Sequence, residues 1–224
     1  MVQESIHKLV RGESLSEQEA HDALAEVMEG GATASQIAGF LVALRLKGET
    51  VDEIVGFAKV MREKVTPIKC NHDRLIDTCG TGGDAVGTFN VSTAAALVAS
   101  GAGCRVAKHG NRAVSSKCGS ADVLKTLGVN VEMEPVSAAR CLDEVGITFL
   151  YAPLLHEAMK YAAPVRRELG IRTVFNLLGP LTNPAGAKRQ LLGVYDGRWT
   201  EHGECASPPW FRPCARRARR RRHG

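Results

Sequence analysis

The chain has 224 residues, 44% of them hydrophobic, a length and composition that predict a globular protein with a sizeable buried core. No apolar run approaches membrane-spanning length and the polar N-terminus lacks a signal-peptide pattern, so we expect no membrane partner. Seven cysteines without metal-type spacing indicate a reducing compartment, so the expected location is the cytoplasm.

The formal net charge of +5 comes from the end of the chain. Residues 197–224 contain eight arginines and two glutamates, which leaves the rest of the chain close to neutral. The body is therefore not a general polyanion binder. The basic segment has no periodicity, and we interpret residues 197–224 as a disordered tail, with a shifted reading frame as one origin. A nucleic-acid arm is the alternative, which the absence of lysine and of folded support disfavours.

Residues 1–66 predict a small helical domain. Three capping boxes occur in series, at Ser16 to Glu19, Thr33 to Gln36 and Thr50 to Glu53. Each box precedes a segment in which apolar residues recur at helical spacing. The lengths are ordinary, so we expect a compact bundle rather than a coiled coil.

Residues 67–196 predict an α/β domain with a mainly parallel sheet, because strand and helix patterns alternate. The expected strands are 74–78, 104–107, 129–133 and 147–151, and the expected helices are 92–100, 120–127, 137–145 and 156–169. We expect the helical segment 156–180 to pack with the helical domain. The sheet is expected to be incomplete at the C-terminal end. Open sheets of this kind bind ligands beyond the carboxyl ends of their strands.

Two glycine-rich segments follow expected strands. The first is Gly80-Thr81-Gly82-Gly83-Asp84, and the second runs from Lys108 to Lys117. Glycine lets the backbone turn tightly and approach a ligand, and a helix beginning near residue 91 would offer its N-terminus to phosphate. The second segment adds fixed cations and hydroxyls. One phosphate-rich ligand would explain both segments.

The first segment also fits the loose dinucleotide pattern G-x-G-x-x-A. That pattern expects an acidic residue about 20 positions later for the ribose hydroxyl. No Asp or Glu occurs between Asp84 and Asp122. A nicotinamide cofactor is therefore disfavoured.

Longer motifs resemble the anthranilate phosphoribosyltransferase family, which joins anthranilate to phosphoribosyl pyrophosphate (PRPP) in tryptophan biosynthesis. The matching segments are 77–84, 90–93, 108–117, 119–122, Arg166 and 175–184, in the same order and spacing. The resemblance covers roughly residues 1 to 195 and implies a small helical domain with a larger α/β domain, as in nucleoside phosphorylases and phosphoribosyltransferases. It also implies a homodimer formed through the N-terminal helices.

The resemblance assigns site residues one by one. Those that would hold PRPP are Gly80, Gly83, Asp84, Thr88, Asn90, Val91, Ser92, Thr93, Lys108, His109, Gly110, Asn111, Arg112, Ala113, Val114, Ser115, Ser116 and Ser120. Gly80, Asn111 and Arg166 would face anthranilate, and Ser92 would contact Mg²⁺. We nominate no catalytic acid or base, because a neutral aryl amine attacks the ribose and positioning with electrostatics can supply the catalysis.

The family pattern also includes an Asp-Glu pair that helps to hold magnesium, downstream of the point where this chain departs from it. No adjacent Asp-Glu follows residue 144 here. We therefore expect a truncated chain with intact binding loops and little turnover. The alternatives are a pyrimidine nucleoside phosphorylase-like enzyme and a catalytically dead remnant.

Overall fold

The computed structural model describes residues 1–82, 89–112 and 118–194, and the backbone of 212–217. The chain divides into two compact units. The helical unit contains Met1–Val65 and His156–Thr182, and the α/β unit contains Thr66–Leu155 and Asn183–Gly224.

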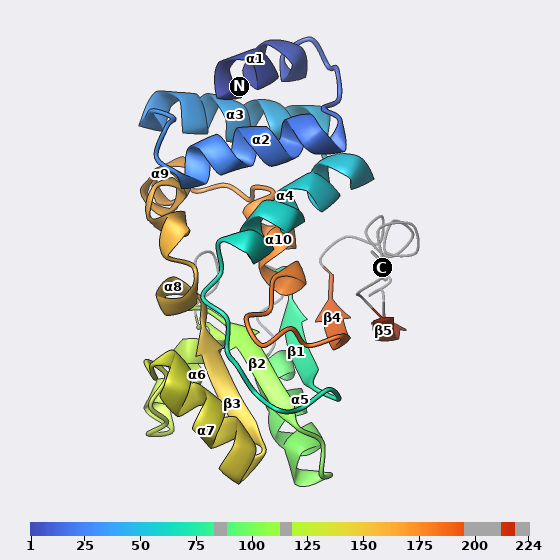
Figure 1. Ribbon diagram of the computed structural model, residues 1–224, viewed down its shortest axis with the longest axis vertical. Helices are drawn as coiled ribbons and strands as arrows, with labels where there is room; N and C mark the ends of the chain where they lie inside the picture. Colours follow the sequence, from blue (N-terminus) through green and yellow to red (C-terminus); the bar gives the residue numbers. More distant parts are fainter. Residues whose placement is uncertain (83–88, 113–117, 195–211, 218–224) are drawn as a thin grey trace, which may run out of the picture. The chain divides into compact units, whose positions relative to one another are not determined.

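The helical unit is built around pairs of packed helices. Its helices are α1 (Val2–Leu9), α2 (Glu17–Met28), α3 (Ala34–Lys47), α4 (Val51–Glu63), the 3₁₀ helix η1 (Glu157–Lys160), α9 (Ala162–Leu169) and α10 (Phe175–Leu181). Helix α2 packs against α4, and α1 packs against α3 (Figure 1). The three predicted capping boxes are present, with both hydrogen bonds of each box formed.

Large apolar side chains and one glycine fix the packing of these helices. Phe40 and Phe57 are fully buried and meet edge to face, with ring centroids 5.9 Å apart. Gly56 lets α4 approach α2 closely, since a Cβ at this position would lie 2.2 Å from the carbonyl oxygen of Glu17. The predicted apolar faces are thus buried against one another within this unit.

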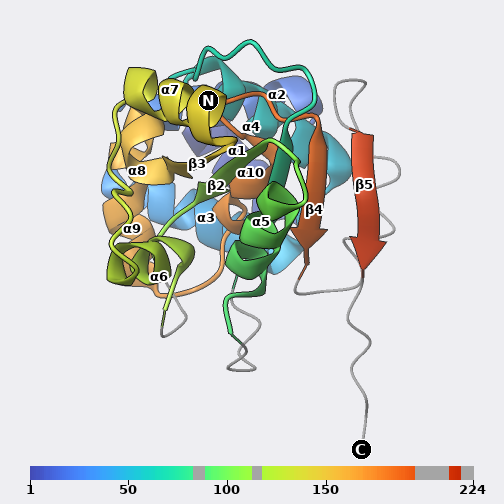
Figure 2. The ribbon, with the colours of Figure 1, turned by 90° about the horizontal axis from the view of Figure 1, so that it is seen from below.

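The α/β unit contains a sheet whose described strands run in the order β3-β2-β1-β4-β5 and are all parallel. The strands are β1 (Ile76–Gly80), β2 (Val106–Gly110), β3 (Ile147–Tyr151), β4 (Arg189–Gly193) and β5 (Arg212–Arg217). The helices are α5 (Val91–Gly101), α6 (Ser120–Thr126), α7 (Pro135–Val145) and α8 (Ala152–Leu155). Helix α5 packs against β1 and β2, and α7 packs against β3 (Figure 2). The predicted fold class is therefore confirmed.

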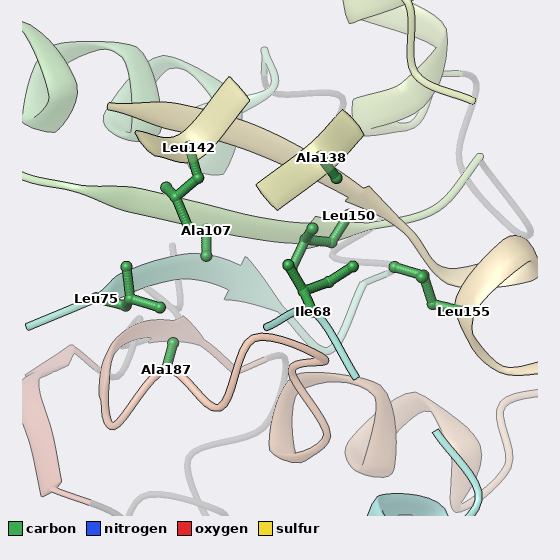
Figure 3. Packing of buried hydrophobic residues seen from close by; sticks show 8 residues of the cluster. All are labelled: Ile68, Leu75, Ala107, Ala138, Leu142, Leu150, Leu155 and Ala187. Atoms are coloured by element: carbon green, nitrogen blue, oxygen red, sulfur yellow. The ribbon is translucent and has the colours of Figure 1, made fainter. Parts of the chain in front are cut away.

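A buried cluster joins the sheet to α7 and to the segments that enter and leave the unit. Its members are Ile68, Leu75, Ala107, Ala138, Leu142, Leu150, Leu155 and Ala187 (Figure 3). Leu142 of α7 and Leu150 of β3 are fully buried in it. The cluster fixes β2 and β3 from one side, and hence the points at which these strands end.

Two predicted elements differ from the structure. Residues 129–133 are not a strand: Val131 is buried, but the Asn130 side chain accepts a hydrogen bond from the Glu132 N–H, a local bond that competes with strand pairing. The predicted helix 156–169 is divided into η1 and α9. Pro164 accounts for the division, because proline lacks the N–H that would bond to the Lys160 carbonyl four positions earlier, and its ring clashes with that carbonyl.

The basic tail also differs in part from the expected disorder. Residues 212–217 form β5, which pairs in parallel with β4. The physical reason is that β4 would otherwise present unpaired N–H and C=O groups at the sheet edge. The other residues of 197–224 lie outside the described part of the chain. No helix among the described residues is long and apolar enough to cross a membrane.

Candidate functional site

The candidate site lies where the order of the strands reverses. Strands β2 and β3 extend from one side of β1, while β4 lies on the other side, so the reversal falls between β1 and β4. Gly80 pairs with Gly193 at the ends of these strands, and the Thr81 N–H donates to the Gly193 carbonyl at 2.9 Å. A Cβ on Gly80 would lie 3.2 Å from that carbonyl oxygen. Ligands of open α/β sheets bind at such a reversal, beyond the carboxyl ends of the strands.

The start of α5 is tied to β1 by side-chain hydrogen bonds. The Thr78 hydroxyl donates to the Ser92 carbonyl at 2.8 Å. The Thr93 hydroxyl donates to Asn90 Oδ1 at 2.8 Å, and Val91 is exposed beside them. These contacts place the N-terminus of an eleven-residue helix next to the end of β1, as an anion-binding site requires.

Lys108 connects β2 to this helix start. Its side chain is 2% exposed, and its ammonium donates to the Thr78 carbonyl at 2.6 Å and to Ser92 Oγ at 3.2 Å. Burial lowers the pKa of Lys108, and the nearby Asp77 opposes this shift. The structure therefore brings together the end of β1, Ser92 and one cation, which sequence reasoning had assigned to the same ligand.

The segment after β2 lies against α6. A Cβ on Gly110 would lie 3.1 Å from Ser120 Oγ and 2.7 Å from a ring carbon of Phe149, so only glycine fits here. The Asn111 carbonyl accepts the N–H of Ala121 at 3.2 Å, and its side chain accepts the Arg112 N–H at 2.7 Å. Gly110, Asn111 and Ser120, all predicted to hold PRPP, thus lie close to one another.

Arg112 and His109 have surroundings that the motif alone did not indicate. Arg112 is exposed, its guanidinium pairs with Glu132 at 3.0 Å and it lies 5.9 Å from the centroid of the Tyr151 ring. The His109 side chain is buried. Glu132 was not predicted to be near the site, since it lies 20 residues from Arg112 in the sequence.

Arg166 belongs to the last turn of α9, in the helical unit. Its guanidinium lies 5.0 Å from the centroid of the Phe175 ring. Desolvation by burial lowers its pKa to about 10. Within the described ranges, no carboxylate forms an ion pair with it. A partly desolvated guanidinium that has no carboxylate partner among these residues is suited to bind the planar carboxylate of a ligand.

The remaining predicted site residues cannot be placed. Gly83, Asp84, Thr88, Ala113, Val114, Ser115 and Ser116 lie outside the described residues. Gly80 and Asn111 belong to the α/β unit and Arg166 to the helical unit. The assignment of all three to anthranilate stays a prediction.

Three buried residues to which sequence reasoning assigned no role, Asp77, Asn183 and Gln190, form hydrogen bonds near the ends of β1 and β2. Asp77 is fully buried and accepts hydrogen bonds from the His109 N–H and from Gln190. Asn183 donates to the Ala107 carbonyl at 2.8 Å. The available signal was a polar residue inside an otherwise apolar strand, which is costly unless it is hydrogen-bonded.

The oxygen atoms near the start of α5 fit a magnesium ion that is shared with substrate. Ser92 Oγ and Asn90 Oδ1 lie 3.5 Å apart and are hard donors of the type that Mg²⁺ prefers. Among the described residues, no group of three or more His, Cys, Asp or Glu side chains could hold a metal. Because the Lys108 ammonium also contacts Ser92 Oγ, a divalent cation here requires further negative oxygens, such as those of substrate phosphates.

Two family models match the chain. Residues 3–65 match the model described as "Glycosyl transferase family, helical bundle domain", and residues 72–204 match "Glycosyl transferase family, a/b domain". The second match extends past residue 195, the expected end of the resemblance.

Relatives with this organisation include anthranilate phosphoribosyltransferases from Pelotomaculum thermopropionicum, 63% identical over 87% of this chain and 56% of the relative, and from Moorella thermoacetica, 62% identical over 90% and 59%. These similarities confirm the resemblance that the motifs indicated. The chain therefore spans less than three fifths of the length of these relatives.

Solved structures that are similar to this chain also include anthranilate phosphoribosyltransferases. The anthranilate phosphoribosyltransferase of Thermus thermophilus is similar with a TM-score of 0.84 and 48% identity, over 90% of this chain and 61% of that chain. The enzyme from Saccharomyces cerevisiae in complex with PRPP and Mg is similar with a TM-score of 0.83 and 31% identity, over 92% and 61%.

Proposed function

The chain belongs to the glycosyl transferase family, and we propose that it carries the PRPP and anthranilate sites of an anthranilate phosphoribosyltransferase. The reaction transfers the phosphoribosyl group of PRPP to the amine of anthranilate and releases pyrophosphate. We further propose that it serves tryptophan biosynthesis, in the cytoplasm and as a homodimer.

The chemistry requires positioning and charge stabilisation more than proton transfer. The aryl amine is neutral near pH 7 and attacks C1 of the ribose while pyrophosphate departs. Lys108 and the N-terminus of α5 would bind the negative phosphates, with Ser92 contributing one oxygen to the bound Mg²⁺. When bound, Mg²⁺ supplies neutralisation of the leaving pyrophosphate.

Arg166 is the observation that supports anthranilate as the second substrate. The described residues provide its guanidinium with an aromatic ring but with no carboxylate. A ligand that combines an aromatic ring with a carboxylate would supply the missing negative charge.

Binding and transfer can be tested separately. Calorimetric titration of the chain with PRPP and Mg²⁺, and then with anthranilate, should show saturable binding of both. Incubation with both substrates and chromatographic detection of phosphoribosyl anthranilate tests transfer. Conversion of a pyrimidine nucleoside with inorganic phosphate, without binding of anthranilate, would favour the nucleoside phosphorylase alternative instead.

We expect Arg112→Ala to weaken the binding of PRPP by about 1.5 kcal/mol, which is about tenfold. The value lies at the lower end for a charged hydrogen bond because Arg112 is exposed and already paired with Glu132. Calorimetry measures the effect. Arg140→Ala is the matched control, since Arg140 is exposed on α7 and pairs with Glu144. Equal affinities of the two variants would contradict the role of Arg112.

A further inference from the structure

The backbone pairing between β1 and β2 gives way to side-chain bonds near the site. Among the described residues, the register between these strands pairs Ile76 with Val106, whereas β1 pairs with β4 along five residues. If the parallel ladder continued from that pair, the His109 N–H would donate to the Thr78 carbonyl. Each of these two groups instead has a side-chain partner from the opposite strand.

Asp77 and Lys108 form these two cross-links. The His109 N–H of β2 donates to Asp77 Oδ1 of β1 at 3.0 Å. The Lys108 ammonium of β2 donates to the Thr78 carbonyl of β1 at 2.6 Å. The positions of both strand ends therefore depend on two charged side chains.

The second oxygen of Asp77 extends the network to β4. Gln190 Nε2 donates to Asp77 Oδ2 at 3.1 Å, and it lies 2.9 Å from Cys79 Sγ. Asp77 is 0% exposed and thus links the three central strands, β2, β1 and β4, close to Gly80 and Lys108. Burial raises the pKa of the Asp77 carboxyl, and the positive charge of Lys108 and the surrounding hydrogen bonds oppose this shift.

The same network is placed to orient the cation of the site. Lys108 reaches Ser92 Oγ from β2, so the position of its ammonium depends on the end of β2. The Asp77 carboxylate accepts the N–H of His109, so it holds the backbone of the residue that follows Lys108.

We propose that Asp77, supported by Gln190, is a positioning residue that aligns Lys108 with Ser92 for the binding of PRPP. The inference rests on the proposed function. Asp77 itself contacts backbone and side chains of the protein, so it acts through the strand end rather than on the substrate.

Exchanging the carboxyl group of Asp77 and the amide group of Gln190 between the two positions tests this role. Asp77→Asn places an amide N–H against Gln190 or His109, both of which donate to Asp77. Gln190→Glu places a second carboxylate beside Asp77 in a buried site. In the double variant D77N/Q190E, the amide oxygen introduced at position 77 can accept the His109 N–H, and the amide N–H can donate to the carboxylate introduced at position 190. The double variant also keeps the charge of the original pair.

Two readouts apply to each variant, after circular dichroism has shown that it is folded. Calorimetry with PRPP and Mg²⁺ should show at least about tenfold weaker binding by each single variant and recovery to within about threefold in the double variant. Amide exchange followed by NMR without ligand should show faster exchange at His109 in the single variants, with protection restored in the double variant. Asp73→Asn, at an exposed carboxylate of the same unit, is the control.

The outcomes separate the two proposals. Folded single variants that bind PRPP as tightly as the original chain would overturn the positioning role, because a purely structural role changes stability but not affinity. A double variant that recovers neither affinity nor protection at His109 would also overturn it. Absence of PRPP binding by the original chain would contradict the proposed function, and unchanged protection at His109 in the single variants would then still refute the link through Asp77.

Discussion

Lys47→Met is expected to lower the free energy of unfolding by about 3–5 kcal/mol. Lys47 and Glu53 form an ion pair at 2.9 Å within the helical unit, and their side chains are 6% and 0% exposed. The Glu53 carboxylate also accepts the backbone N–H groups of Leu15 and Thr50. Removal of the ammonium leaves a buried negative charge without its cation, which costs far more than the loss of an exposed ion pair.

Chemical denaturation followed by circular dichroism measures this loss. Lys59→Met is the matched control, because Lys59 pairs with Glu17 while both side chains are about 40% exposed, and we expect a change of about 0–1 kcal/mol. The double variant K47M/E53Q should recover part of the stability, since an amide oxygen can still accept one of the N–H bonds without a charge. Similar losses for Lys47→Met and Lys59→Met would refute the argument.

Local sequence signals predicted much of the helical unit. Ser16, Thr33 and Thr50 form their capping boxes because both partners of each box lie within four residues of one another. The box at Thr50 also identified Glu53. It did not indicate that Lys47 and Leu15 share the same carboxylate, because Leu15 lies 38 residues from Glu53 and only the tertiary fold brings them together.

The same limit applies to the α/β unit. Alternating patterns predicted the strands that became β1, β2 and β3, since each begins with a short apolar stretch and is followed by a helix pattern. The prediction for 129–133 was wrong because a local side-chain bond at Asn130 replaces strand pairing, although Val131 is buried as a strand residue would be. β5 was not predicted, because its pairing depends on the free edge of β4 rather than on its own pattern.

The candidate site shows which features a motif can convey. The glycine segments located the ends of β1 and β2, and Lys108 and Ser92, both predicted to hold PRPP, lie within hydrogen-bond distance of one another. The buried hydrogen-bond network of Asp77 and Gln190 was not predicted, because the two residues lie 113 positions apart and no periodicity links them. Glycines and cations are recognisable in sequence by their conformational freedom and charge. A buried polar network becomes visible only when the strand order is known.

Arg166→Ala should weaken the binding of anthranilate by about 1.5–3 kcal/mol, equivalent to about 10- to 150-fold, and leave the binding of PRPP nearly unchanged. The substitution removes the guanidinium that we propose pairs with the anthranilate carboxylate, while the PRPP residues belong to the other unit. Arg167→Ala is the control, since Arg167 is the exposed neighbour on the same helix. Calorimetric titration with each ligand separates the two effects.

The pH dependence of the same interaction follows from the surroundings of Arg166. Desolvation lowers its pKa to about 10, so the guanidinium is charged below this pH and loses its proton as the pH rises through it. Anthranilate remains a carboxylate over that range, and its affinity should therefore decrease as the pH rises through about 10. The test compares the affinity from about pH 8 to about pH 10.5 in the original chain and in Arg166→Ala, with circular dichroism to verify folding at each pH. A decrease of the same size in Arg166→Ala would show that another group titrates. Equal losses of anthranilate affinity and PRPP affinity on substitution of Arg166 would contradict its place in the anthranilate site.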